Sequence, residues 1–349
     1  MQHNAPHLSA TFEGWYSKFT LPSGASLALI VCSVPNATRK PHMVCLTYVP
    51  RDASKIFQSE LWVDNIERLH TGPGNAFELR VPGIGHVRCD PDSATSYQFS
   101  HPSFSFSAKT RTHTPWHSSK STPEGLLVHL PLPLHWHVQS LASECDFELQ
   151  VPSLGLSELP DSDRSGQATV HQEKNWANSF PRAHIWIQAR DNDRDGAHGI
   201  CLAGGQVLGM TAYLLGYRGI NPLHSIDFTP PYALSVFGLS PFMSVTHDWE
   251  KRRFALSVQG LWQKVAVKAT APAGTFFALA APFAEGFRDN FLAESFAATV
   301  EVEVWRKVGW GSWFGFGQWR LVCKDRFEGA SLEFGAEYYP CRGSEKKRN

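Results

Sequence analysis

Glu13 and Trp15, near the start of the chain, are the first residues whose types and spacing could support acid–base chemistry. They belong to the sequence FEGWY (residues 12–16), whose alternation predicts a β-strand with Glu13 and Trp15 on one face. A carboxylate beside an indole is poorly hydrated, and the loss of hydration raises a carboxyl pKa until the group can donate a proton near neutral pH. The alternative is a surface glutamate beside two core aromatic residues.

A second group lies in the middle of the chain, where His135 and His137 flank Trp136. Two histidines at positions i and i+2 of a strand share a face, as metal ligands or acid–base partners would. A metal site would need a third ligand, for which His171 and Glu173 are the available residues, and the ligand spacing of common zinc sites is missing. We therefore expect structural or acid–base histidines and no bound metal.

A third group is EKNW (residues 173–176), followed by Arg182 and then by Trp186 and Gln188. It places an acid, a base, an amide and an indole side by side near the middle of the chain. Such a group suits a site in which charged side chains pair while aromatic rings exclude water. A salt-bridge cluster that only stabilises a domain junction explains the same residues equally well.

The elements that must position these residues are predicted to be strands. Short segments with period-two alternation are separated by turn residues at intervals of roughly 8–15 residues, which is typical of β-sandwiches and β-barrels. The clearest turn is the sequence PGIG (residues 82–85), which predicts a hairpin between 76–81 and 86–89. Residues 126–130 are also predicted to form a strand, and one weakly amphipathic stretch, residues 284–297, predicts a short helix. The sequence therefore predicts an all-β protein.

The domain organisation is suggested by length and by one polar stretch. A chain of 349 residues accommodates two domains, and residues 158–172 are rich in Ser, Asp, Gly and Pro, which predicts a loop or linker. We expect an N-terminal β domain at 1–175, a C-terminal β domain at 176–341 and a charged tail at 342–349. Each half has about eight predicted strands, enough for one small barrel.

Composition excludes several functions and locations. Lys+Arg and Asp+Glu are both 32, so no net charge favours nucleic acid, and no aromatic platform interleaved with basic residues is found. We expect no secretory signal and no membrane insertion, because the first residues lack an apolar core after a basic segment and no apolar stretch is long enough to span a bilayer. Seven widely spaced cysteines do not suggest a disulfide framework. We expect a cytoplasmic protein, and its 12 Trp and 23 Phe suit either a pocket for a large apolar ligand or a core of large residues.

Taken together, FEGWY (12–16), HWH (135–137), EKNW (173–176), FPR (180–182) and WIQ (186–188) resemble the tocopherol cyclase family in order and approximate spacing. The resemblance spans nearly the whole chain, and EKNW with its FPR sequel is its most specific part. It implies two lipocalin-like β-barrel domains packed side by side and a ring-closing enzyme that needs no cofactor. Family members protonate an alkene of a prenylated quinol and close a chroman ring, and relatives of the same architecture include fungal cyclases that promote Diels–Alder reactions.

Departures from the family pattern point away from a plastid quinol as substrate. Ser17 stands where the family usually has a large residue, and Ala177 and Asn178 follow EKNW where glycines are usual. A cyclase of specialised metabolism fits better, acting on a small apolar prenylated phenol, polyene or meroterpenoid.

This hypothesis assigns roles to the candidate residues. The general acid would be Glu13 or Glu173, with Lys174 holding a substrate oxygen and His135 or His137 accepting a phenol proton. The substrate-binding residues would be Trp15, Tyr16, Trp136, Asn175, Trp176, Arg182, Trp186 and Gln188. Two alternatives remain: a pericyclase in which Lys174 or Asn175 only polarises a carbonyl, and a non-catalytic lipocalin-like carrier of an apolar ligand.

Overall fold

The structure is a computed structural model, and it describes residues 3–117, 120, 122–132, 134–178, 180–191, 197–207, 209–309, 317–340 and 342–343. The expected charged tail at 342–349 lies almost entirely outside the described residues. The chain divides into two compact units. The first contains the described residues up to Phe180 together with Ala280–Asp289, and the second contains Pro181–Leu279 and the described residues from Asn290 onward.

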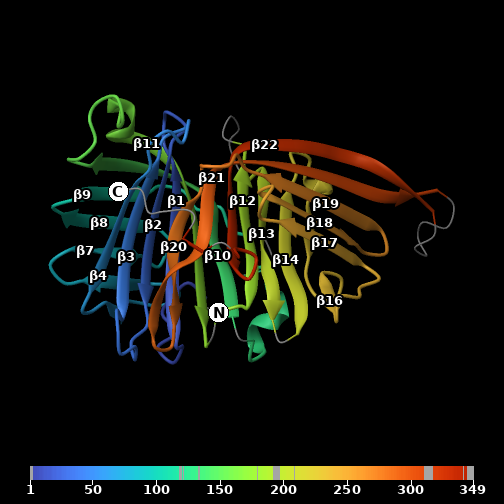
Figure 1. Cartoon of the computed structure of the whole chain (residues 1–349), viewed down its shortest axis with the longest axis horizontal. Helices are drawn as coiled ribbons and strands as arrows, with labels where there is room; N and C mark the ends of the chain where they lie inside the picture. The colour runs from blue at the N-terminus through green and yellow to red at the C-terminus, as the bar shows by residue number, and fades with distance from the viewer. Residues whose placement is uncertain are drawn as a thin grey trace. The chain divides into compact units, whose positions relative to one another are not determined.

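The first unit is built on one sheet of 11 strands (Figure 1). In spatial order these are β4 (Phe57–Val63), β3 (His42–Val49), β2 (Ser26–Ser33), β1 (Phe12–Thr20), β11 (Ser165–Ala177), β10 (Leu134–Gln150), β9 (Phe104–Thr110), β8 (Thr95–His101), β7 (Gly85–Cys89), β6 (Phe77–Val81) and β5 (Glu67–His70). Each strand is antiparallel to its neighbours within this order.

The first sheet curls, because strands far apart in its order touch across its interior. Arg68 on β5, at one edge of the sheet, contacts Glu13 on β1 at 2.8 Å, and the rings of Trp15 on β1 and Phe77 on β6 are 5.9 Å apart. Curling encloses the apolar face and turns the inward side chains toward one another.

Another sheet of 11 strands builds the second unit, except that residues 280–283 of β20 and 286–289 of β21 belong to the first unit. Its main order is β15 (Ile226–Phe228), β14 (Met210–Arg218), β13 (Gly199–Val207), β12 (Ala183–Arg190), β22 (Gln318–Ala336), β21 (Gly286–Val308), β19 (Gln263–Thr270), β18 (Arg253–Gln259) and β17 (Met243–Asp248), with β16 (Leu234–Val236) paired to β14 and β20 (Phe277–Phe283) paired to β21. The rings of Tyr213 on β14 and Phe254 on β18 are 5.7 Å apart, so this sheet also curls around its core.

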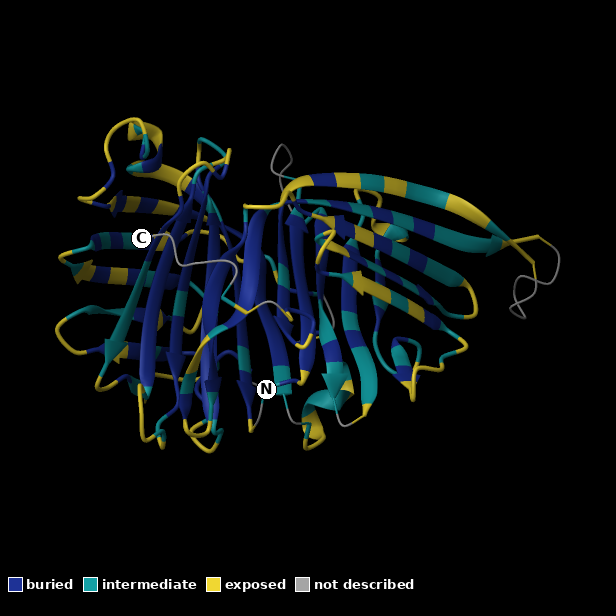
Figure 2. Cartoon of the chain, viewed as in Figure 1, coloured by how far each residue is buried: buried dark blue, intermediate teal, exposed yellow. Residues whose placement is uncertain are grey.

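Large aromatic residues fill the core of the first unit. Phe19 packs edge-to-face against Tyr97 and Phe106 at 5.3 and 5.0 Å, an arrangement that adds to the free energy gained from burial alone. Figure 2 shows strands β8 and β9 alternating between buried and more exposed residues, whereas β1, β2 and β3 are almost continuously buried. The aromatic surplus of the sequence is therefore largely core material in this unit.

Three local predictions are wrong. Residues 284–297 are not helical, since most of them belong to β21, where bulges between Ser295 and Val300 disrupt the alternation expected of a strand. Residues 126–130 are not a strand: they belong mostly to the 3₁₀ turn Gly125–His129, which begins at a glycine with a φ of 55°. Residues 165–172, predicted to be part of a linker, form the first half of β11.

The PGIG hairpin is confirmed, with β6 and β7 paired around Gly83 at a φ of 73°. Two further 3₁₀ turns span Asp161–Asp163 and Pro222–His224. No helix in the described part of the chain has the length and apolar character needed to cross a bilayer.

Candidate functional site

Three neighbouring strands of the first unit, β1, β11 and β10, bring the sequence motifs together. Glu13 is paired with Trp176, which is paired in turn with His135. Trp15 is paired with Lys174, which is paired with His137 on the other side. Residues paired directly across a sheet share a face, so six of the candidate residues form two adjacent rows inside the first unit.

The centre of this group is a buried ion pair between Glu13 and Lys174. Lys174 Nζ is 2.8 Å from Glu13 Oε1, and Arg68 Nη1 is 2.8 Å from Glu13 Oε2. The side chains of Glu13 and Lys174 are both 0% exposed. Burying charges is costly unless they are paired and hydrogen-bonded, and here each oxygen of the carboxylate has a cationic partner.

The protein environment shifts the pKa of both partners of this pair. Burial alone would raise the pKa of Glu13, but contacts with His7 and the charge of Lys174 outweigh it and lower the pKa to about 2. Burial lowers the pKa of Lys174 to about 8, against the opposing charge of Glu13. Glu13 is therefore ionised at neutral pH, and the expectation that desolvation leaves it protonated is wrong, because its cationic partners dominate. The mobile proton belongs to Lys174.

Two indoles flank the ammonium group of Lys174. Its Nζ lies 4.6 Å from the ring centroid of Trp15 and 5.2 Å from that of Trp176. Rings at this range attract a cation and keep water away from it. Two cations, Lys174 and Arg68, share the single negative charge of Glu13, so the group has a net positive charge. Such a group can stabilise a ligand oxygen that gains negative charge beside Lys174.

The N-terminal strap, residues 3–7, covers this group. The indole N–H of Trp15 donates to the carbonyl oxygen of Asn4 at 2.9 Å, and Lys174 donates to the carbonyl oxygen of Ala5. The backbone N–H of His7 donates to Glu13, and its ring stacks on Trp176 with centroids 4.1 Å apart.

The strap also contributes two neutral imidazoles. Lys174 Nζ is 2.7 Å from Nδ1 of His7, whose pKa is lowered from 6.5, mainly by burial, so the neutral ring accepts this bond. The ring of His3 is 5.6 Å from that of His137, and burial lowers the pKa of His3 to about 4. A ligand can reach Lys174 in the interior only if the strap moves.

The two histidines of the HWH motif have different surroundings. His135 Nδ1 is 2.8 Å from the Glu124 carboxylate, and its ring stacks on Trp176 at 5.0 Å. His137 is 4% exposed, and burial lowers its pKa to about 3, so it is neutral at physiological pH. Its Nε2 is 3.3 Å from the side-chain oxygen of Gln139, and its Nδ1 has no hydrogen-bond partner among the described residues.

Four other candidates point to the opposite face of the same strands. Tyr16 is paired with Glu173, whose Oε2 lies 3.0 Å from His171 Nε2. Trp136 is paired with Asn175 and packs edge-to-face on Trp116 at 5.8 Å. Because neighbouring residues of a strand alternate between faces, these residues are separated from Glu13 and Lys174 by the sheet itself.

The same alternation separates the histidines of the HWH motif from the residues considered as a third metal ligand. His171 and Glu173 cannot join His135 and His137 as ligands, because the two pairs lie on opposite faces. Within the described residues no group of three or more His, Cys, Asp or Glu side chains could hold a metal ion.

The last three candidates belong to the second unit. Trp186 and Gln188 are buried on β12, where they alternate with the core residues Ile185 and Ile187. Arg182 is 77% exposed and forms an ion pair with Glu337 at 2.6 Å. In the structure its guanidinium is engaged at the surface of its own unit.

Sequence reasoning missed His3, His7, Arg68 and Glu124. Glu124 precedes HWH by only 11 residues, but it reaches His135 from a turn rather than from a strand. Arg68 lies 55 residues from Glu13, and only the curling of the sheet brings them together. No local pattern in the sequence marks such contacts.

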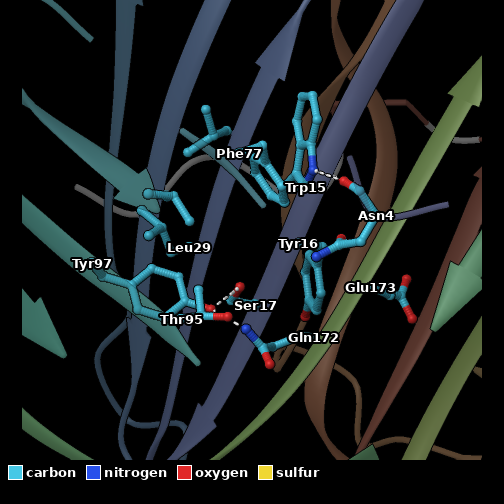
Figure 3. A pocket seen from close by; sticks show the side chains of 12 residues that line it. Asn4, Trp15, Tyr16, Ser17, Leu29, Phe77, Thr95, Tyr97, Gln172 and Glu173 are labelled. Carbon is cyan, nitrogen blue, oxygen red and sulfur yellow. Dashed lines mark hydrogen bonds between the residues drawn. The ribbon is translucent and has the colours of Figure 1, made fainter. Parts of the chain in front are cut away.

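Beside the ion pair lies a small cavity in the first unit, shown in Figure 3. Its volume is about 20 Å³, room for about one water molecule and far below the several hundred cubic ångströms of a typical ligand pocket. Its walls include Leu29, Val31, Phe77 and Val87, and Asn4 of the strap contributes to the lining.

Comparison with known proteins reveals a shared fold. No protein-family model matches the chain, and no curated protein matches its sequence. Kievitone hydratase from Nectria haematococca superposes with a TM-score of 0.58 at 7% identity, over 96% of this chain and 91% of that chain. An AttH-type protein from Nitrosomonas europaea gives a TM-score of 0.50 at 12% identity, over 96% and 95%. CghA in complex with Sch210972 gives 0.48 at 11%, over 93% and 88%.

At these identities the likeness shows the fold alone. The prediction of an all-β chain built from two lipocalin-like domains is confirmed, since the first two structures cover nearly the whole chain. Function must be argued from the site rather than from the fold.

Proposed function

We propose that this chain is a cofactor-independent enzyme, tocopherol cyclase-like in kind, that closes a ring on an apolar natural product bound inside the first unit. The observation that carries the proposal is the fully buried pair of Glu13 and Lys174 between two indoles. A structural core gains little from such a pair, because well-packed apolar side chains often stabilise a fold as well or better. Perturbed titratable groups in an enclosed site are typical of catalysis.

The motifs behind the family resemblance support the same proposal. FEGWY, EKNW and HWH lie on β1, β11 and β10, three adjacent strands, although they are far apart in the sequence. Kievitone hydratase, an enzyme by name, has the same fold, which is support by analogy only.

The electrostatics favour polarisation of a substrate oxygen over protonation of an alkene. Glu13 has no proton to give at neutral pH, and an ammonium group with a pKa of about 8 is too weak an acid for an isolated alkene. Once the strap withdraws the Ala5 carbonyl and the His7 ring, Lys174 can instead donate a charge-assisted hydrogen bond to a carbonyl or phenol oxygen and stabilise the negative charge that develops there. Glu13, which is itself held by Arg68, positions Lys174, and the indoles exclude water.

This mechanism suits a pericyclic closure or the capture of a polarised enone by a hydroxyl group. Holding the chain of the substrate in a reactive conformer can supply roughly 7–11 kcal/mol of the barrier. His137 is neutral, and its Nδ1 has no hydrogen-bond partner among the described residues. It can therefore accept a hydrogen bond from the attacking hydroxyl group.

The test is conversion of a panel of prenylated phenols, polyenes and meroterpenoids, followed by chromatography and mass spectrometry. We expect a product with the mass of its substrate and a new retention time. In heavy water a pericyclic product should carry no deuterium on carbon, whereas closure of an enone by a hydroxyl group should place deuterium only on the carbon next to the carbonyl. Lys174→Met should reduce turnover about 100-fold, within the range for a placed proton donor or oxyanion-stabilising group.

The matched control is Lys109→Met, which removes an exposed lysine from β9 and should leave turnover unchanged. Release of every bound compound unchanged would identify a carrier instead. Deuterium on a carbon that is not next to a carbonyl, or full activity of Lys174→Met, would contradict the polarisation mechanism.

A further inference from the structure

The small cavity of the first unit has a polar end formed by Ser17, Tyr97 and Gln172 (Figure 3). The side-chain amide of Gln172 donates to the Tyr97 hydroxyl at 2.7 Å, and the hydroxyl oxygens of Tyr97 and Ser17 are 2.9 Å apart. All three residues are buried.

This cluster has hydrogen-bonding capacity left over. Gln172 is 5% exposed, yet its Oε1 has no hydrogen-bond partner among the described residues. Ser17 and Tyr97 together have two O–H groups, and their mutual hydrogen bond uses only one of them. Gln172 Oε1 therefore remains as a spare acceptor beside at least one spare O–H donor, and leaving a buried polar group unsatisfied is costly.

One spare donor and one spare acceptor are the complement of a hydroxyl group, which both donates and accepts. The lining also includes the apolar residues Leu29, Val31, Phe77 and Val87, together with the polar residues Asn4 and Thr95. Gln172 and Lys174 are two residues apart on the same face of β11, so their Cα atoms are about 7 Å apart.

We infer that Ser17, Tyr97 and Gln172 are a hydroxyl-binding subsite, and that the ligand is an apolar molecule with a hydroxyl group in addition to the oxygen held by Lys174. The inference deepens the proposed function and rests on it for the role of Lys174. Asn4 of the strap lines the cavity, so movement of the strap both exposes Lys174 and enlarges the space beside the subsite.

The test compares two ligands that differ only in the hydroxyl group. One probe is a chalcone with a phenolic hydroxyl para to its carbonyl, and the other is the methyl ether of the same compound. Binding to the full chain is followed by quenching of tryptophan fluorescence. We expect the phenol to bind roughly tenfold more tightly than the ether, because only the phenol satisfies Gln172.

Four variants locate the effect. Gln172→Leu should reduce the phenol preference to about one, and Ser17→Ala should reduce it in part, which provides a second, smaller change if the first variant folds poorly. Gln167→Leu removes an exposed glutamine from the same strand and should preserve the preference. Lys174→Met should weaken both probes and keep their ratio.

The outcomes separate the two proposals. A phenol preference that survives Gln172→Leu, no preference in the wild type, or binding of neither probe would overturn the subsite and leave a cavity that holds a structural water only. A preference that depends on Gln172, in a protein that converts no member of the substrate panel, would support the subsite while the proposed catalytic function fails.

Discussion

Replacing Glu13 by glutamine tests the electrostatic account of the site without any knowledge of the substrate. Glu13→Gln preserves shape but removes the charge that faces Lys174 and Arg68. The pKa of Glu13 falls from 4.5 to about 2 in the folded protein. A shift of that size corresponds to about 3 kcal/mol of folding free energy. Removal of one partner from a buried ion pair costs about the same, roughly 3–5 kcal/mol.

The direction of the pKa shift determines how the stability difference between the wild type and Glu13→Gln changes with pH. The folded-state pKa lies below the unfolded value, so the stabilisation is complete above about pH 4.5 and is lost as the pH falls toward 2. We expect Glu13→Gln to be about 3 kcal/mol less stable than the wild type at pH 7. The difference should shrink to about half of that near pH 3.

Urea denaturation followed by tryptophan fluorescence, between pH 7 and pH 3, measures this difference. Because the chain has two compact units, the comparison concerns the transition that the substitution shifts. Glu148→Gln on β10 is the matched control, since Glu148 is exposed, and its effect should stay within about 0.5 kcal/mol. A difference below 1 kcal/mol at pH 7, or one that does not change with pH, would refute the buried ion pair as described.

Three further predictions concern the same unit. The pKa of Lys174 is about 8 in the folded protein, below its reference value of 10.5, so the unfolded chain holds this proton more tightly. The thermal stability of the wild type relative to Lys174→Met should therefore rise between pH 8 and pH 10. A fall in this range would contradict the burial of the ammonium group. The Asn4 side chain contacts the thiol of Cys89, so Asn4→Cys places two thiols side by side. A disulfide between them should fix the strap in place and abolish binding of the chalcone phenol, and dithiothreitol should restore it. Unchanged binding in the oxidised variant would show that the strap need not move. Gly14→Ala would bring a Cβ to 2.8 Å from Asn175 Oδ1 and should lower the free energy of unfolding by about 1–3 kcal/mol. Asn175→Ala removes the contacting atom and should restore part of this loss in the double variant. An equal loss in the double variant would mean that the contact is not the cause.

The physical reason that the strands could be predicted is that alternation is a local property. The all-β class, the PGIG hairpin and the shared face of Glu13 and Trp15 all follow from neighbours two residues apart. The same reasoning failed for residues 284–297, where bulges in β21 break the period of two. It failed for residues 126–130 because apolar composition alone does not distinguish a strand from a turn.

The sequence by itself determined which residues of each motif share a face, and therefore that Lys174 and Trp176 are separated from Glu173 and Asn175. It could not determine which strands are neighbours, because pairing β1 with β11 joins segments about 160 residues apart. Only the tertiary structure decided that Glu13 meets Lys174, that Arg68 crosses the interior to reach it and that the strap covers both. Those contacts in turn set the charge of Glu13: burial alone would have kept its proton, and the cations brought by folding remove it.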